Sequence, residues 1–99
     1  MKLTERLTSN DLDSWDDLQE HQYIFLRSYS DKEPCAIVFK CPGCKTPIHV
    51  SVKDHTGEPG WIINFETLTA TPSIFHKRDG RGCGWHGYLT DGTLEGKIE

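Results

Sequence analysis

This chain lacks the features of several large protein classes. Its 99 residues leave no room for two hydrophobic cores, so we expect a single domain over residues 1–99. No stretch approaches the roughly 20 apolar residues of a membrane span. The N-terminal segment, residues 1–10, lacks the apolar region of a signal peptide. Repeats and low-complexity segments are absent too. These absences favour a cytoplasmic protein without a membrane partner.

A basic surface is also missing. Residues 1–34 carry four basic and eight acidic side chains, whereas residues 35–99 carry seven of each. Proteins that bind nucleic acid through its phosphates concentrate Lys and Arg on one face. Nucleic-acid binding is therefore an alternative that the charge distribution does not favour.

One short helix is expected near the N-terminus. Leu12, Trp15 and Leu18 recur at helical spacing, with acidic residues between them and an N-cap at Ser9 or Asn10. We therefore expect residues 1–22 to form a helical arm.

The rest of the chain predicts a mainly β domain, residues 23–99, with about six short and mostly antiparallel strands. Aromatic, β-branched and alternating residues place these strands at residues 23–29, 35–40, 47–53, 61–66, 85–90 and 93–98. Pro72 predicts that residues 68–75 form an edge strand or an extended loop. Asp91-Gly92 predicts a type I′ turn between the last two strands.

Two pairs of metal-binding residues share one spacing. The first is Cys41-Pro42-Gly43-Cys44, and the second is Cys83-Gly84-Trp85-His86. Paired cysteines in a cytosolic chain indicate a metal more often than a disulfide. We therefore predict one zinc ion held by Cys41, Cys44, Cys83 and His86. The fourth ligand stays open, because His49 or His76 could replace His86.

Enzymatic readings compete with a structural role for this zinc. A nucleobase deaminase is excluded, since the chain has no H-x-E motif followed by P-C-x-x-C. A nucleophilic Cys83–His86 pair is disfavoured because zinc would occupy both residues. A catalytic zinc needs an open coordination position, with Glu66, His49 or His76 as a base. Four good ligands favour a closed, structural site instead.

Several motifs together resemble a known family. They are the Cys41–Cys44 knuckle, the segment Thr71-Pro72-Ser73-Ile74, and Cys83-x-x-His86-Gly87-Tyr88-Leu89-x-Asp91-Gly92. Over residues 35–96 the chain resembles a small uncharacterised zinc-knuckle family of bacteriophages and prophages, often mislabelled "ammonia monooxygenase". Relatives of that family occur beside bacterial ubiquitin-like conjugation genes, where a peptidase role has been suggested.

The resemblance implies a compact zinc-binding β domain, located in the host cytoplasm if a phage encodes it. It also makes Ser73 a candidate functional residue, although a turn hydroxyl bonded to the backbone is the simpler interpretation.

We therefore predict a structural zinc in a protein-binding or regulatory module rather than an enzyme. Its partner is expected to be a protein, on a surface of Ser73, His76, Lys77, Arg78, Arg81 and Trp85. The first alternative is a zinc-dependent hydrolase or peptidase that acts on a ubiquitin-like or other protein. The second is a zinc-ribbon module that binds nucleic acid.

Overall fold

The computed structural model describes residues 2–8, 11, 14, 17–27, 34–53, 59–76 and 82–98. Eight strands are formed in these ranges. They are β1 (Glu5–Leu7), β2 (Gln22–Arg27), β3 (Pro34–Lys40), β4 (Pro47–Ser51), β5 (Ile62–Asn64), β6 (Thr69–His76), β7 (Trp85–Thr90) and β8 (Thr93–Ile98). The prediction of a mainly β fold is confirmed.

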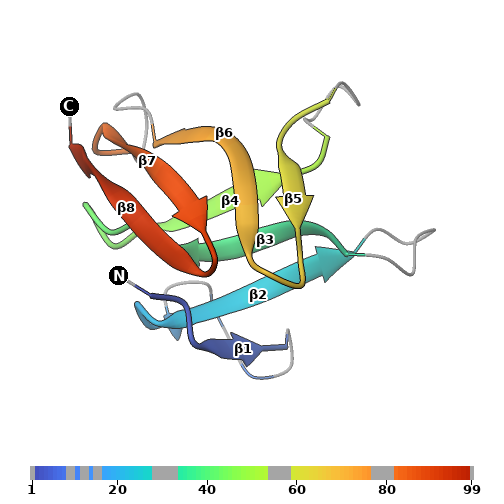
Figure 1. Cartoon of the computed structure of the whole chain (residues 1–99). Coiled ribbons are helices and arrows are strands. Elements are labelled where there is room, and N and C mark those ends of the chain that lie inside the picture. The colour runs from blue at the N-terminus through green and yellow to red at the C-terminus, as the bar shows by residue number, and fades with distance from the viewer. Residues whose placement is uncertain are drawn as a thin grey trace.

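The strands form two four-stranded sheets, in the orders β1-β2-β3-β4 and β5-β6-β7-β8. All neighbours pair antiparallel except β1 and β2, which are parallel. In Figure 1 the β5–β8 sheet lies in front of β3 and β4, and its strands cross those behind. Two sheets that cross in this way bury one face each against the other.

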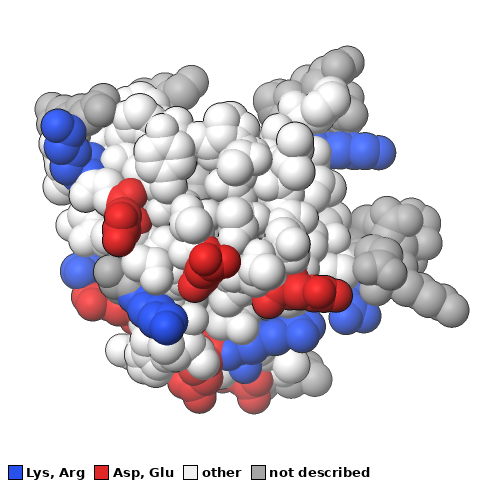
Figure 2. Space-filling view, in the orientation of Figure 1, with Lys and Arg blue, Asp and Glu red and all other residues white. Residues whose placement is uncertain are grey.

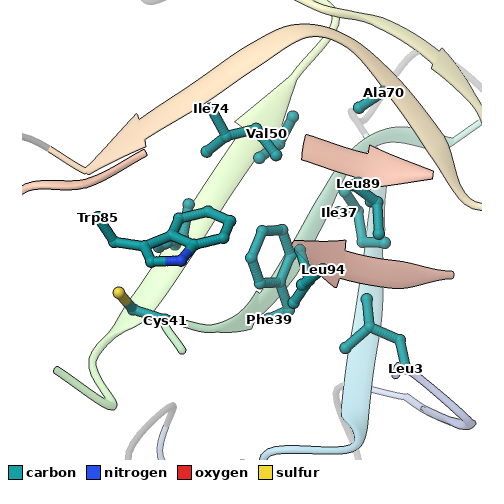
Figure 3. Close-up of a cluster of buried hydrophobic side chains, with 11 residues drawn as sticks. Leu3, Ile37, Phe39, Cys41, Val50, Ala70, Ile74, Trp85, Leu89 and Leu94 are labelled. Atoms are coloured by element: carbon teal, nitrogen blue, oxygen red, sulfur yellow. The ribbon is translucent and has the colours of Figure 1, made fainter. Parts of the chain in front are cut away.

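One shared core lies between the two sheets. It holds apolar side chains of β3, β4, β6, β7 and β8 together with Leu3, and Figure 3 shows them meeting in one cluster. The alternation predicted for β4 is confirmed, because Ile48 and Val50 are buried there while His49 between them is exposed. Leu18, Ile24 and Val38 form a second cluster.

The final hairpin follows the sequence closely. Thr90 pairs with Thr93 across the turn, and both turn residues have positive φ, 48° at Asp91 and 77° at Gly92. These are the backbone angles of the predicted type I′ turn.

The expected N-terminal helix is not seen. Its candidate N-caps, Ser9 and Asn10, and residues 12, 13, 15 and 16 lie outside the described residues. The described part of this arm instead contains β1, which pairs with β2, and Leu3, which enters the core. A strand at the sheet edge pairs its backbone N–H and C=O groups with the neighbouring strand. The spacing of apolar residues in a short segment does not predict such pairing. Among the described residues, none forms a helix of the length and apolarity required to cross a membrane.

Strand β6 corrects a second expectation, because it lies inside its sheet rather than at an edge. Ala70 pairs with Leu89 and Ile74 with Gly87, so the three residues 71–73 face Tyr88 alone. Such a bulge interrupts the ladder and accommodates Pro72, which cannot donate a backbone hydrogen bond. Two extra residues keep the alternation in phase, and both Ala70 and Ile74 therefore reach the core.

Candidate functional site

The first cysteine pair forms a tight turn between β3 and β4. The backbone N–H of Gly43 donates to Cys41 Sγ at 3.3 Å, and the N–H of Lys45 donates to the Cys41 carbonyl at 3.0 Å. The Cys41 N–H in turn donates to the Thr46 carbonyl at 2.8 Å. This turn has no room for a side chain at Gly43, because a Cβ there would lie 2.6 Å from Cys83 Sγ.

The second half of the cluster comes from the facing ends of β6 and β7. Gly84 has a φ of 89°, a conformation that side chains with a Cβ rarely adopt. Its N–H donates to the His76 carbonyl at 2.7 Å, which brings Cys83 beside His76. The group therefore joins the β3–β4 turn of one sheet to the β6–β7 end of the other.

Cys41, Cys44, His76 and Cys83 converge so that their ligand atoms all lie within 4.8 Å of one another. Cys41 Sγ lies 3.6 Å from Cys83 Sγ, and Cys44 Sγ lies 3.7 Å from His76 Nδ1. Around a tetrahedral zinc, bonds of about 2.3 Å to sulfur and 2.0 Å to nitrogen place two sulfurs about 3.8 Å apart and a sulfur and a nitrogen about 3.5 Å apart. These two contacts therefore match edges of a zinc tetrahedron, and the four residues fit one metal ion.

The electrostatics of the cluster also suit a cation. Burial raises the pKa of the Cys41 thiol to about 11. Burial alone would also raise the pKa of Cys44, but hydrogen bonds from the Thr46 hydroxyl, at 3.0 Å, and backbone hold it below its usual value. Burial lowers the pKa of His76, which favours the neutral imidazole that ligates metals. A divalent cation would stabilise thiolates at all three cysteines.

His86 lies outside this group, which differs from the predicted ligand set. Strand β7 begins at Trp85, and Trp85 points into the core with an exposed fraction of 3%. Side chains alternate along a strand, so His86 points to the opposite face of the sheet. There its Nε2 lies 2.8 Å from the Ser73 hydroxyl oxygen. The structure thus brings three of the four predicted ligands together and puts the alternative, His76, in the fourth place.

The Ser73–His86 contact is held from several sides. The bulge in β6 displaces Ser73 from regular pairing, and bulges commonly re-aim a side chain. The indole N–H of Trp61 donates to the Ser73 carbonyl at 3.3 Å. The Phe75 ring packs edge-on against the His86 ring, with centroids 5.6 Å apart. A hydroxyl within hydrogen-bond reach of an imidazole can be activated as a nucleophile.

The other predicted site residues separate into three groups. Trp85 is buried beside Cys41 (Figure 3), so it is corrected from a surface residue to a core residue. His49 and Glu66, considered as bases for a catalytic zinc, are exposed and outside the metal cluster. Lys77, Arg78 and Arg81 lie outside the described residues.

Both groupings follow once the register of β6 against β7 is known. His76 at the end of β6 pairs with Trp85 at the start of β7, and this register brings His76 near Cys83. Residues 73, 75 and 86 then share the outer face of that pair, because side chains alternate. Pro72 made residues 68–75 resemble an edge strand or a loop, so the sequence did not predict that β6 pairs with β7 along its length.

No curated protein and no solved structure matches the chain. A family model matches residues 9–96, and that family, BubE, is described as a bacterial ubiquitination-like system serine protease. The match extends from the N-terminal arm to β8 and includes the metal cluster and the Ser73–His86 contact. The chain therefore belongs to the BubE family.

Proposed function

We propose that this protein is a serine peptidase with a structural zinc centre, which acts on a protein of a bacterial ubiquitination-like system. The observation that carries the proposal is the 2.8 Å contact between Ser73 Oγ and His86 Nε2. The description of the family as a serine protease supports the same chemistry. The protein partner expected from the sequence then becomes the substrate.

In this mechanism Ser73 is the nucleophile and His86 is the general base. With the imidazole proton on Nδ1, His86 Nε2 accepts the Ser73 hydroxyl proton as Oγ bonds to the substrate carbonyl carbon. The tetrahedral intermediate collapses when His86 gives that proton to the leaving amide nitrogen, and the C–N bond breaks. Water, deprotonated by the same imidazole, then hydrolyses the acyl-enzyme and restores Ser73.

A bound zinc would support this chemistry from outside the reacting groups. Cys41, Cys44, Cys83 and His76 would supply four ligands, which is the full number for a structural zinc. Ser73 and His76 both lie on β6, three residues apart. His86 lies near the start of β7, and Cys83 precedes it by three residues, just before the strand begins. The metal would therefore hold together the two strands that carry the nucleophile and the base. This role replaces the zinc-dependent hydrolase of the sequence analysis, in which zinc itself would activate water.

Labelling with a fluorophosphonate probe tests the proposal directly. Such probes phosphonylate a serine that a base has activated, and mass spectrometry locates the adduct. We expect an adduct on Ser73 in the native protein and none after Ser73→Ala or His86→Gln. Ser51→Ala is a matched control, because Ser51 is another half-buried strand serine outside the site. Labelling that survives His86→Gln at the native rate would refute the assignment of the base.

Zinc content separates this proposal from a catalytic zinc. Ser73→Ala should retain one zinc per chain while losing all peptidase activity. A Ser73→Ala variant that still hydrolyses peptides and is inhibited by a chelator would instead support zinc-activated water.

A further inference from the structure

The outer face of the β5–β8 sheet carries a third side chain in line with Ser73 and His86. Phe75 on β6 pairs with His86 on β7, and His86 pairs with Lys97 on β8. Side chains of directly paired residues lie on one face, with Cβ atoms about 5 Å apart. Ser73 precedes Phe75 by two residues and lies on the same face. Across the sheet, the nucleophile, the base and the Lys97 ammonium therefore follow one another.

A hollow of about 380 Å³ opens on this face directly beside His86. His86 and Lys97 stand on one side of it and Tyr88 and Glu95 on the other, with the backbone of Gly87 and Gly96 between the two pairs. Figure 2 shows that the middle of the face over β6 and β7 is largely uncharged. The lining of the hollow itself carries one cation, Lys97, and one acid, Glu95.

Lys97 is also available for a ligand. The ion pairs among the described residues are His21–Glu5 and Lys45–Glu20, and neither involves Lys97. Glu95 lies two residues before Lys97 on β8, on the Tyr88 side of the hollow, where it would repel an acid placed on that side. A carboxylate is thus favoured at the His86 side of the hollow and disfavoured at the Tyr88 side.

The chemistry of the reaction indicates that the leaving group lies on the His86 side of the site. In acyl transfer by a serine and a histidine, the imidazole protonates the leaving nitrogen, so the leaving group departs over the histidine. The scissile bond would lie at Ser73, and a leaving group that extends from it over His86 would reach Lys97. We propose, on the basis of the proposed function, that Lys97 is a specificity-determining residue that binds a carboxylate on the leaving group. The carboxylate belongs to a C-terminal residue or to an Asp or Glu side chain directly after the scissile bond.

A peptide mixture tests this inference and separates the two sources of the carboxylate. Each peptide is supplied as a C-terminal acid and as a C-terminal amide, and each contains Asp, Asn, Glu or Gln at varied positions. Mass spectrometry then gives relative kcat/KM for every bond. Cleavage of the last bond in acids but not in amides identifies the terminal carboxylate. Cleavage before Asp and Glu in both forms identifies the side chain.

The ratio of kcat/KM for acidic over matched neutral leaving groups is the readout for Lys97. A hydrogen bond to a charged group discriminates by about 10- to 100-fold, so Lys97→Met should lower the ratio by that factor. Lys97→Arg should retain most of it, and Lys53→Met, a control on an exposed lysine after β4, should leave it unchanged. No preference in the native protein, or an unchanged ratio in Lys97→Met, overturns the inference.

Failure of this inference is distinguishable from failure of the proposed function. Ser73 labelled by fluorophosphonate, with no preference for acidic leaving groups, overturns the role of Lys97 alone. Absence of the Ser73 adduct overturns the peptidase and the role of Lys97 together.

Discussion

Removal of one ligand of the proposed zinc should strongly destabilise this domain, because a metal bound by the cluster would join its two sheets. Cys41 and Cys44 lie in the turn between β3 and β4, whereas His76 ends β6 of the facing sheet and Cys83 lies just before β7. We choose Cys83→Ser, since a serine hydroxyl is a poor zinc ligand and changes the side-chain volume little. Cys35→Ser is the matched control, because Cys35 is a half-buried free cysteine of β3 outside the cluster.

The expected loss is large relative to the stability of a small domain. A ligand present at a thousand times its Kd stabilises the folded state by about 4 kcal/mol. A domain of this size has a total unfolding free energy of about 5–15 kcal/mol. One kcal/mol corresponds to roughly 4–8 °C in Tm for domains of up to about 100 residues, so loss of zinc should lower Tm by at least about 15 °C.

Two measurements check this expectation. Elemental analysis should find one zinc per chain in the native protein and in Cys35→Ser, and less than a tenth of that in Cys83→Ser. Circular dichroism during heating should show the loss in Tm for Cys83→Ser, and the same loss for the native protein after incubation with a strong chelator. If Cys83→Ser melted within about 2 °C of the native protein, or the purified chain held no zinc, the cluster would not be a structural metal centre.

Three further predictions concern the Cys41–Cys44 turn, the pH dependence of zinc binding and the positioning of Ser73. Gly43→Ala places a Cβ 2.6 Å from Cys83 Sγ, so we expect about 10-fold faster loss of zinc to a chromogenic chelator, by analogy with substitutions that disturb metal ligands indirectly; an unchanged rate would contradict the close approach. At neutral pH the Cys41 thiol, with a pKa raised to about 11 by burial, keeps its proton until zinc displaces it. Zinc affinity in chelator competition should therefore fall by about 10-fold for each displaced proton as the pH drops by one unit, and a pH-independent affinity would argue against a buried thiol. Trp61→Phe removes the N–H that donates to the Ser73 carbonyl at 3.3 Å, so fluorophosphonate labelling should slow several-fold at unchanged zinc content; labelling at the native rate would show that Trp61 does not position Ser73.

Local chemistry made much of this protein predictable. The Cys41–Cys44 knuckle depends only on a four-residue segment, because a Pro-Gly turn between two cysteines brings their thiols together without distant contacts. Alternation in β4 and the Asp91-Gly92 turn are equally local, and both appear as expected. The sequence therefore determines the mainly β fold and three of the four residues of the metal cluster.

The pairing of distant strands decided the rest. Whether His76 or His86 joins the cysteines depends on where β7 begins and on which face Trp85 is buried, and neither follows from the spacing in Cys83-x-x-His86. The contact between Ser73 and His86 likewise requires a bulge that shifts the register of β6 against β7 by two residues. Register is a property of two strands packed on a common core, so only the tertiary structure could separate a metal ligand from a candidate catalytic base.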